Sequence, residues 1–390
     1  MSILFYDDSP VFGGHEVMAL LGVRAVLEDF PGPVHFFASR ANTKLCGQVA
    51  ALAADHPQLT LETLPHHSSK LEALRNLLQP SRSRVLAGRF RQIGPSLVVA
   101  IQGNIEHSSL ALHAARRAHI PSTSYIPVPH SNAAMGARLG AVRDLVARRL
   151  FLLPDSFITI TDEMANLLRL RGATAPIHLV YNGVDTSRFQ PGDALEACRQ
   201  LALPPDKIRL GMIGRIEFRQ KQQHLLVQAV AADPALAASC HLVFAGDGPD
   251  HEPLHGLIAR HHLSATVLPW CDPAILYQAI DALIIPSRYE GLPLVMLEAL
   301  ASGTAVLGSD RDGMKDLLPA AWRFQPGDPA ALATTLADWI QQGRPRPDPT
   351  LVARVRDSMS LRSFRQSFSA TVRALANGDA TQLSETCRAR

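Results

Sequence analysis

The chain has 390 residues, of which 47% are hydrophobic and 19% charged, and its formal net charge is +3. This balance indicates a globular chain rather than a disordered one, and the length favours two domains of roughly 150–200 residues. No run of about 18 uninterrupted apolar residues occurs, so no membrane span is expected. The opening MSILFYDDSP lacks a basic segment and is expected to be a buried strand, not a signal peptide.

The five cysteines are scattered and show no C-x-x-C spacing. We therefore expect neither a disulfide framework nor a zinc site, and a reducing cytoplasm is the expected location.

Charge is unevenly spread along the chain. Residues 66–149 hold twelve Lys and Arg against three acids, a net charge of +9, whereas residues 191–340 hold eleven against seventeen, a net charge of −6. A basic first half favours contact with an anionic partner, although a solvated basic face would give the same charge distribution in the sequence.

Short apolar runs alternate with amphipathic stretches, which is the pattern of parallel α/β sheets. In the first half, strands are expected at 2–6, 34–39, 59–64, 96–102, 123–128 and 156–161. In the second half they are expected at 208–214, 240–246, 266–270, 282–287 and 304–309. Helices between them include 16–29, 108–118, 222–232, 252–261 and 294–301. Each half therefore has enough strands for its own doubly wound domain.

The domain boundary is expected after YNGVDTSRFQPGD, where Asn, Gly, Pro and Asp cluster. This gives a first domain over 1–185 and a second over 186–350. A separate helix is expected at 351–376, after the break GRPRPDPT, followed by a flexible tail at 377–390.

The segment IIPSRYEGLPLVMLEALASG carries the main chemical signal. An apolar strand ends at Pro286, Glu290 lies in the loop, Gly291 allows close backbone approach, and an apolar-faced helix follows. Such a junction places helix N–H groups at the carboxyl edge of a sheet, where anionic ligands bind. Glu298 lies about two turns further along. Taken alone, the two glutamates also fit a loop acid and a helix-surface residue.

EGLPLVMLEALASG resembles the E-x7-E signature of glycosyltransferase family 4 and its GT-B relatives. The resemblance implies that Glu290 contacts hydroxyls of a donor sugar and that Glu298 contacts the ribose of the nucleotide. It also implies that the backbone at Gly291 and Leu292 meets the diphosphate or the sugar.

IGRIEFRQKQQ is similar to the family's G-R–loop–K element, in which an Arg and a Lys clamp the donor diphosphate. The resemblance assigns this clamp to Arg215 and Lys221. Charge on a departing nucleoside diphosphate must be met by cations and helix dipoles when no metal is present. The loop is one residue longer than the commonest family form, so Arg219 is an alternative to Lys221.

Two further elements resemble the family in the same order. AGDGP implies backbone contacts to the nucleotide from Gly246 and Gly248, although turn geometry alone also favours glycine there. NGVD, at Asn182–Asp185, corresponds to an interdomain element. The family usually has Gly where this chain has Trp270, which leaves the identity of the base undecided.

In the first half, Gly13 and Gly14 permit a tight loop whose N–H groups face a phosphate. His15 could touch substrate, or could cap the helix or be exposed. His130 follows a strand and resembles the family histidine that contacts the donor sugar near the reacting carbon. His107 is a weaker candidate, and a lone histidine after an apolar strand is often structural.

Many cations of the first half lie in two groups: Arg82, Arg84, Arg89 and Arg91, and the stretch 136–151. We take as a hypothesis that this domain docks on an anionic membrane surface at the inner face of the membrane. The spacing Asp310–Asp312 is that of metal-dependent glycosyltransferases, but it lies downstream of the E-x7-E helix in a turn that binds no metal in the family. No metal and no cofactor are expected.

The resemblance implies a GT-B fold: α/β, with two doubly wound Rossmann-like parallel-sheet domains facing a cleft. It also implies that the C-terminal helix at 351–376 crosses back onto the first domain. It implies retaining transfer of a hexose-type sugar from a nucleotide sugar to a glycan or lipid-linked acceptor, with no nucleic-acid partner. Two alternatives stay open. One is a nucleotide-sugar epimerase or hydrolase on the same fold, and the other is a non-catalytic sugar-nucleotide-binding subunit.

Overall fold

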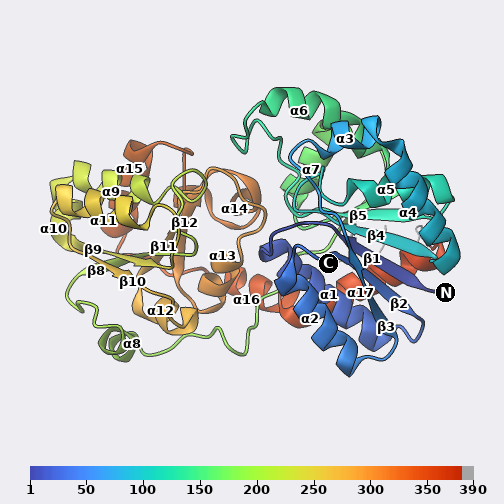
Figure 1. Cartoon of the computed structure of the whole chain (residues 1–390). Helices are drawn as coiled ribbons and strands as arrows, with labels where there is room; N and C mark the ends of the chain where they lie inside the picture. Colours follow the sequence, from blue (N-terminus) through green and yellow to red (C-terminus); the bar gives the residue numbers. More distant parts are fainter. Residues whose placement is uncertain (380–390) are drawn as a thin grey trace. The chain divides into compact units, whose positions relative to one another are not determined.

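The computed structural model describes residues 1–379, so most of the tail expected at 377–390 lies outside the described residues. The chain divides into two compact units (Figure 1). Among the described residues, unit 1 consists of Met1–Tyr181 together with residues 362–379, and unit 2 of Asn182–Leu361.

Unit 1 is built on a seven-stranded, fully parallel sheet with the order β3-β2-β1-β4-β5-β6-β7. Its strands are β1 Ile3–Asp7, β2 Val34–Ser39, β3 Leu59–Leu64, β4 Leu97–Ile101, β5 Ser122–Tyr125, β6 Ser156–Thr159 and β7 Ile177–Leu179. Its helices are α1 Gly14–Asp29, α2 Thr43–Asp55, α3 Glu72–Leu78, α4 Pro80–Ile93, α5 Ser109–Ala118, α6 Gly140–Ala147, α7 Asp162–Leu170 and α17 Leu361–Asn377, with a 3-10 turn η1 at Arg148–Leu152.

Helices cover both faces of this sheet, because alternate residues of its buried strands face opposite sides. On one face, Leu4, Tyr6 and Val98 pack with Leu86 and Phe90 of α4 and with apolar residues of α5. On the other face, Tyr125 of β5 meets Phe368 of α17 edge-on at 5.4 Å between ring centroids.

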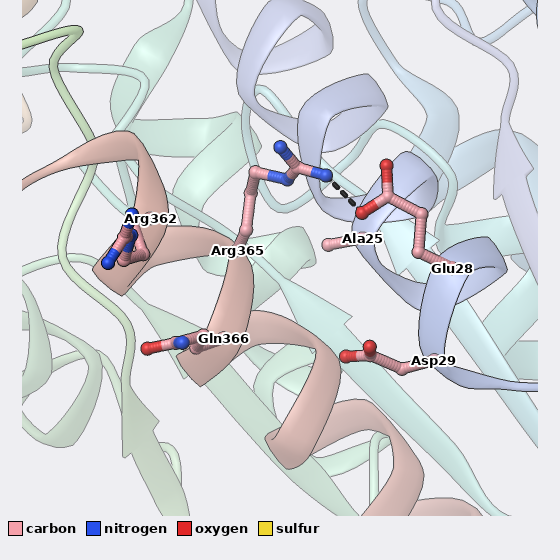
Figure 2. Close-up of a pocket in the computed structure, with 6 residues that line it drawn as sticks. All are labelled: Ala25, Glu28, Asp29, Arg362, Arg365 and Gln366. Carbon is pink, nitrogen blue, oxygen red and sulfur yellow. Dashed lines mark hydrogen bonds and ion pairs between the residues drawn. The ribbon is translucent and has the colours of Figure 1, made fainter. Parts of the chain in front are cut away.

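The C-terminal helix α17 packs against α1. A Cβ added to Gly22 of α1 would lie only 2.6 Å from the Phe368 ring, so this glycine is needed for the close approach. Beside it, Arg365 pairs with Glu28, at the edge of a pocket that Ala25, Glu28, Asp29, Arg362, Arg365 and Gln366 line (Figure 2).

Unit 2 has a six-stranded parallel sheet with the order β10-β9-β8-β11-β12-β13. Its strands are β8 Ile208–Ile213, β9 Cys240–Ala245, β10 Ala265–Leu268, β11 Ala282–Ile285, β12 Ala305–Ser309 and β13 Arg323–Phe324. Its helices are α8 Ala194–Gln200, α9 Gln223–Ala232, α10 Pro234–Ser239, α11 His251–Arg260, α12 Pro273–Ala279, α13 Leu294–Ala301, α14 Asp312–Leu317, α15 Pro329–Gln341 and α16 Pro349–Ser358, with a 3-10 turn η2 at Ala320–Trp322.

Strand order reverses once in each sheet. The reversal lies between β1 and β4 in unit 1, and between β8 and β11 in unit 2. At such a point the two loops that leave the carboxyl ends of neighbouring strands diverge to opposite faces, which opens a crevice for a ligand. The loops in question follow β1 and β4 in one unit, and β8 and β11 in the other.

The strands and the five helices expected from the sequence are confirmed to within about three residues at their ends. The α/β fold class is also confirmed. Two short edge strands, β7 and β13, were missing from the expectation. The single helix expected at 351–376 is wrong: two helices, α16 and α17, occupy that region. The chain breaks between them because Val184 N–H donates to Met359 O and Leu361 N–H donates to Val184 O.

Between residues 1 and 379, no helix is long and apolar enough to cross a membrane.

Candidate active site

Glu290 lies in the loop that joins β11 to α13, at the switch point of the unit 2 sheet. The buried strand ends at Ile285, and α13 begins after Pro293, whose fixed φ suits a helix start. Gly291 and Leu292 are buried between them. The sequence expectation of a strand, a Gly-containing loop and a helix is therefore confirmed at this site.

Lys221 and Glu290 form an ion pair across the two loops of the switch point. Lys221 Nζ lies 2.6 Å from Glu290 Oε1, and the side chains are 26% and 9% exposed. The loops are also joined through their backbones, because Arg288 N–H donates to Gln220 O at 2.7 Å. The structure thus brings together two of the predicted site residues from segments 69 residues apart.

Arg215 lies just beyond the end of β8, after Gly214, and its side chain is 60% exposed. It pairs with Glu217 in the same loop. Gln223, at the start of α9, fixes this loop: its side-chain amide donates to Arg215 O at 2.9 Å and accepts from Glu217 N–H at 3.2 Å. These hydrogen bonds fix the backbone from which the Arg215 side chain projects.

Asp312, which the sequence analysis set aside with Asp310, supports Glu290. Its Oδ2 accepts the backbone N–H of Glu290 at 2.8 Å and the Arg311 Nε–H at 3.0 Å. Asp312 has φ +52°, in the left-handed region of backbone conformation. Aspartate and asparagine adopt this conformation more readily than other non-glycine residues do. Asp310 instead pairs with Arg323. The two aspartates therefore have separate partners within this turn.

Glu298 lies on α13 and accepts a hydrogen bond from the Tyr277 hydroxyl at 2.7 Å. Burial raises the pKa of the Glu298 carboxyl, while this hydrogen bond opposes the rise. Tyr277 belongs to α12, which Asp272 caps by accepting from Ala274 N–H. Trp270 lies just before this cap and is 79% exposed, so a large aromatic ring is available at the carboxyl side of β10.

Gly246 and Gly248 lie against the loop that follows β8. A Cβ on Gly246 would lie 2.2 Å from Gly214 O, and one on Gly248 would lie 2.2 Å from Ile216 O. Gly246 also has φ +137°. Close packing of two backbone segments therefore requires both glycines, whether or not their N–H groups also meet a nucleotide.

The NGVD element holds the start of α13. Asn182 Nδ2 donates to Leu292 O at 3.0 Å, and Asp185 accepts from the N–H groups of Ser187 and Arg188. Both residues thus have structural contacts within unit 2.

In unit 1, the Gly-Gly loop follows β1 and leads into α1. Gly13 N–H donates to Glu16 Oε2 at 2.7 Å, which closes a capping interaction at the helix start. Gly14 is exposed and begins the helix. The capping residue is therefore Glu16 and not His15, which corrects one of the roles considered for the histidine.

His15 lies between two carboxylates. Its Nε2 is 2.9 Å from Glu16 Oε1, and the ligand-type atoms of Asp7, His15 and Glu16 all lie within 4.8 Å of one another. Burial raises the pKa of Asp7 to about 7. Burial alone would lower the pKa of His15, but Glu16 and Asp7 raise it above its ordinary value. The three groups form one coupled charge cluster at the carboxyl end of β1.

The other two histidines singled out from the sequence are also in unit 1. His130 is 7% exposed and lies in the segment beyond β5. His107 lies in the loop after β4; burial lowers its pKa to about 4, and its Nε2 is 3.1 Å from Asn104 Nδ2. A neutral His107 therefore forms part of the packed switch-point loop of unit 1.

Sequence reasoning missed three residues that hold the site: Asp312, Tyr277 and Gln223. Asp312 and Tyr277 act on Glu290 and Glu298 through contacts between separate segments, so no local spacing reveals them. Gln223 lies only eight residues from Arg215 and fixes its own loop. The left-handed conformation of Asp312 at a helix start could only have been suspected from the Asp-Gly pair that follows Arg311.

Two family profiles match the chain over most of its length. The family described as "Glycosyltransferase Family 4" matches residues 33–188, and the one described as "Glycosyl transferases group 1" matches residues 207–342. The first match lies in and just beyond unit 1, and the second covers the predicted Arg215, Lys221, Glu290 and Glu298. The chain belongs to glycosyltransferase family 4.

Curated relatives include a D-inositol 3-phosphate glycosyltransferase of Actinosynnema mirum, 35% identical over 214 residues, which are 48% of this chain and 51% of that protein. Another, from Nocardia farcinica, is 33% identical over 44% of this chain and 41% of its own length. The chain thus spans about half the length of the curated relatives it matches.

Solved structures show the same fold along nearly the whole chain. Anabaena Alr3699/HepE, solved in complex with UDP-glucose, has a TM-score of 0.72 and 18% identity and covers 96% of this chain and 100% of its own. The lipopolysaccharide outer core galactosyltransferase WaaB has a TM-score of 0.71, 17% identity, and coverage of 96% and 99%. The fold is GT-B.

Proposed function

We propose that this protein is a retaining, metal-independent glycosyltransferase. It moves a hexose-type sugar from a nucleotide sugar to a hydroxyl of a glycan or lipid-linked acceptor, in the synthesis of a cell-surface polysaccharide or glycolipid. The Lys221–Glu290 pair at the unit 2 switch point, with Arg215 on the same loop, is the observation that carries the proposal.

The reaction breaks the bond between the anomeric carbon and the diphosphate oxygen, and forms a bond from that carbon to the acceptor oxygen, whose proton is released. Negative charge grows on the departing diphosphate. Arg215 and Lys221 supply two cations for it on a loop that Gln223 and the backbone of residues 217–223 hold in place. Such fixed charges lower the barrier because they need no reorganisation during the reaction.

Glu290 has two roles in this proposal. Its carboxylate orients the Lys221 ammonium, and it accepts hydrogen bonds from hydroxyls of the donor sugar. Glu298, half-buried and held by Tyr277, accepts from the ribose hydroxyls. Both glutamates then hold the donor, and neither serves as an acid or base in the transfer.

A uridine nucleotide sugar is the donor class to test first, because the HepE structures contain UDP and UDP-glucose. The inositol phosphate relatives act, by their names, on a phosphorylated polyol. We take the acceptor to be held by unit 1, near the Gly13–Gly14 loop and His130. His130 would then approach the donor sugar near the reacting carbon.

A panel of nucleotide sugars, measured by thermal shift and then by nucleoside diphosphate release, tests the proposal. Binding of one donor should raise the melting temperature, since a ligand that binds only the folded state stabilises it. Release of nucleoside diphosphate should require an acceptor hydroxyl. If nucleoside diphosphate is released and the only other product is the free or epimerised sugar, the epimerase or hydrolase would be favoured. If a nucleotide sugar binds but no nucleoside diphosphate is released with any acceptor, a non-catalytic subunit would be favoured.

A further inference from the structure

Large apolar side chains are exposed on two neighbouring helices of unit 1, α3 and α6, which pack against each other (Figure 1). We call the exposed set on these helices and their flanking turns the apolar surface; it consists of Leu71, Leu74, Leu77, Leu78, Leu139, Val142, Leu145 and Leu152. The exposed fraction reaches 73% at Leu78 and 74% at Leu145. So many exposed leucines on adjacent helices mark an interaction site.

In α3 the usual arrangement of a surface helix is reversed. Its polar residues face inward: Glu72 is fully buried and pairs with Arg82 at 2.6 Å, and buried Asn76 donates to Ser109 Oγ at 3.0 Å. Its leucines, Leu74 and Leu77 among them, face outward. A helix on an ordinary water-exposed face has the opposite distribution.

The same reversal occurs in α6. Arg143 pairs with buried Glu106, and Asp144 accepts from Asn132 N–H at 2.8 Å and pairs with Arg171. Val142 and Leu145 are exposed at 59% and 74%. Two adjacent helices therefore turn their charges into the unit and their apolar side chains outward, an arrangement that water alone does not favour.

The exposed charges within the two segments that carry the apolar surface are all positive. In the segments 70–78 and 138–152, the exposed charged residues are Lys70, Arg138, Arg148 and Arg149. The two acids of these segments, Glu72 and Asp144, have side chains only 0% and 14% exposed and are paired. Two cations that the sequence placed among the docking groups are paired instead: Arg82 with buried Glu72, and Arg89 with Glu62 in an exposed pair.

We propose that the apolar surface and its four cations form a docking site for an anionic lipid bilayer. Leucines enter the boundary of the acyl chains while Lys70, Arg138, Arg148 and Arg149 meet lipid phosphates. A second copy of this chain fits less well, because a two-fold contact through this face would bring like charges together.

This inference deepens the proposed function by naming the surface that would bring unit 1 to a lipid-linked acceptor. Binding to lipid is measured without donor or acceptor, so its failure and the failure of the glycosyl transfer can be told apart.

The test is co-sedimentation of the full chain with phosphatidylcholine vesicles, with and without phosphatidylglycerol. We expect binding to the mixed vesicles and little to phosphatidylcholine alone. Leu77→Glu/Leu145→Glu should weaken binding at least about tenfold, since it removes apolar insertion and adds repulsion. Leu195→Glu on α8, equally an exposed leucine but in unit 2, should leave binding unchanged.

Arg148→Gln/Arg149→Gln tests the cations without touching the leucines. Because each cation near an anionic surface strengthens binding about fivefold, this variant should bind about 25-fold more weakly. Arg199→Gln/Arg260→Gln in unit 2 is the matched control. The proposal would be overturned if the wild-type protein did not bind the vesicles, or bound them equally with and without phosphatidylglycerol. It would also be overturned if both test variants bound as tightly as the wild-type protein. Self-association abolished by Leu77→Glu/Leu145→Glu would overturn it in favour of a second copy.

Discussion

The Lys221 ammonium lies 2.6 Å from the Glu290 carboxylate, although the two residues come from different loops of the unit 2 sheet. The pair is more than half shielded from water, so each charge orients the other more strongly than an exposed pair would. A donor diphosphate that enters this switch point meets a lysine already fixed in place. This relationship connects the two motifs recognised in the sequence into one site.

Lys221→Ala should lower turnover by about 100-fold or more, the usual cost of losing one preorganised charge donor. Steady-state assays of nucleoside diphosphate release measure it. Arg219→Ala is the matched comparison, because Arg219 is the alternative clamp residue two positions earlier in the chain. A loss below about threefold in the first variant and a large loss in the second would reassign the clamp to Arg219.

Asp312→Ala should reduce kcat/KM about 10-fold to 100-fold, because the buried Glu290 N–H loses its acceptor at a cost of about 1–3 kcal/mol. Asp312→Asn keeps an acceptor oxygen and should lose much less. Asp310→Ala serves as the control, since Asp310 pairs with Arg323 at the surface. Equal losses in both alanine variants, restored by a divalent metal, would instead indicate a metal site at this turn.

Chelation should leave turnover unchanged. In our proposal Arg215 and Lys221 stabilise the charge on the leaving group, so EDTA has no ion to remove from the reaction. Assays before and after chelation, with added Mg²⁺ and Mn²⁺, check this. Loss of activity that only a metal restores would contradict it, and the Asp7, His15 and Glu16 cluster would then be the first place to look.

Asp7→Asn should stabilise the protein more at pH 8 than at pH 5. Burial raises the pKa of Asp7 to about 7, so between about pH 4 and 7 the folded chain keeps a proton that the unfolded chain has lost. Stability from this group therefore falls as pH rises through that window, and it stays low above it. The substitution keeps the oxygen that accepts from Ser9 N–H at 2.9 Å.

Thermal denaturation at the two pH values measures this effect, with an expected rise of about 3 °C or more at pH 8. Asp55→Asn, at an exposed position at the end of α2, is the control. An equal shift at both pH values would show that the buried carboxyl does not titrate in this range.

The sequence predicted the local parts of this protein well, and the structure shows why. Strand β2 begins and ends where its apolar run does, because it is buried in the sheet of unit 1. The edge strand β3 instead follows the alternation of LTLETL, since only part of it is buried. The strand–loop–helix junction at Glu290 follows from Gly291 and Pro293. Strands β7 and β13 escaped prediction because three and two residues are too few to show a period.

Contacts between distant segments were beyond sequence reasoning. The break between α16 and α17 has no Gly or Pro; it exists because Val184 takes up the backbone bonds of Met359 and Leu361. The inward-facing polar residues of α3 depend on Glu106, Arg82 and Ser109, which lie elsewhere in the chain.

The most direct test of the central claim is NMR of the product formed from an α-linked nucleotide sugar. The account predicts that an acceptor hydroxyl gains a sugar in α linkage, with one nucleoside diphosphate released for each sugar transferred and no metal required. A β-linked product, or release of nucleoside diphosphate with no new glycosidic bond, would contradict it.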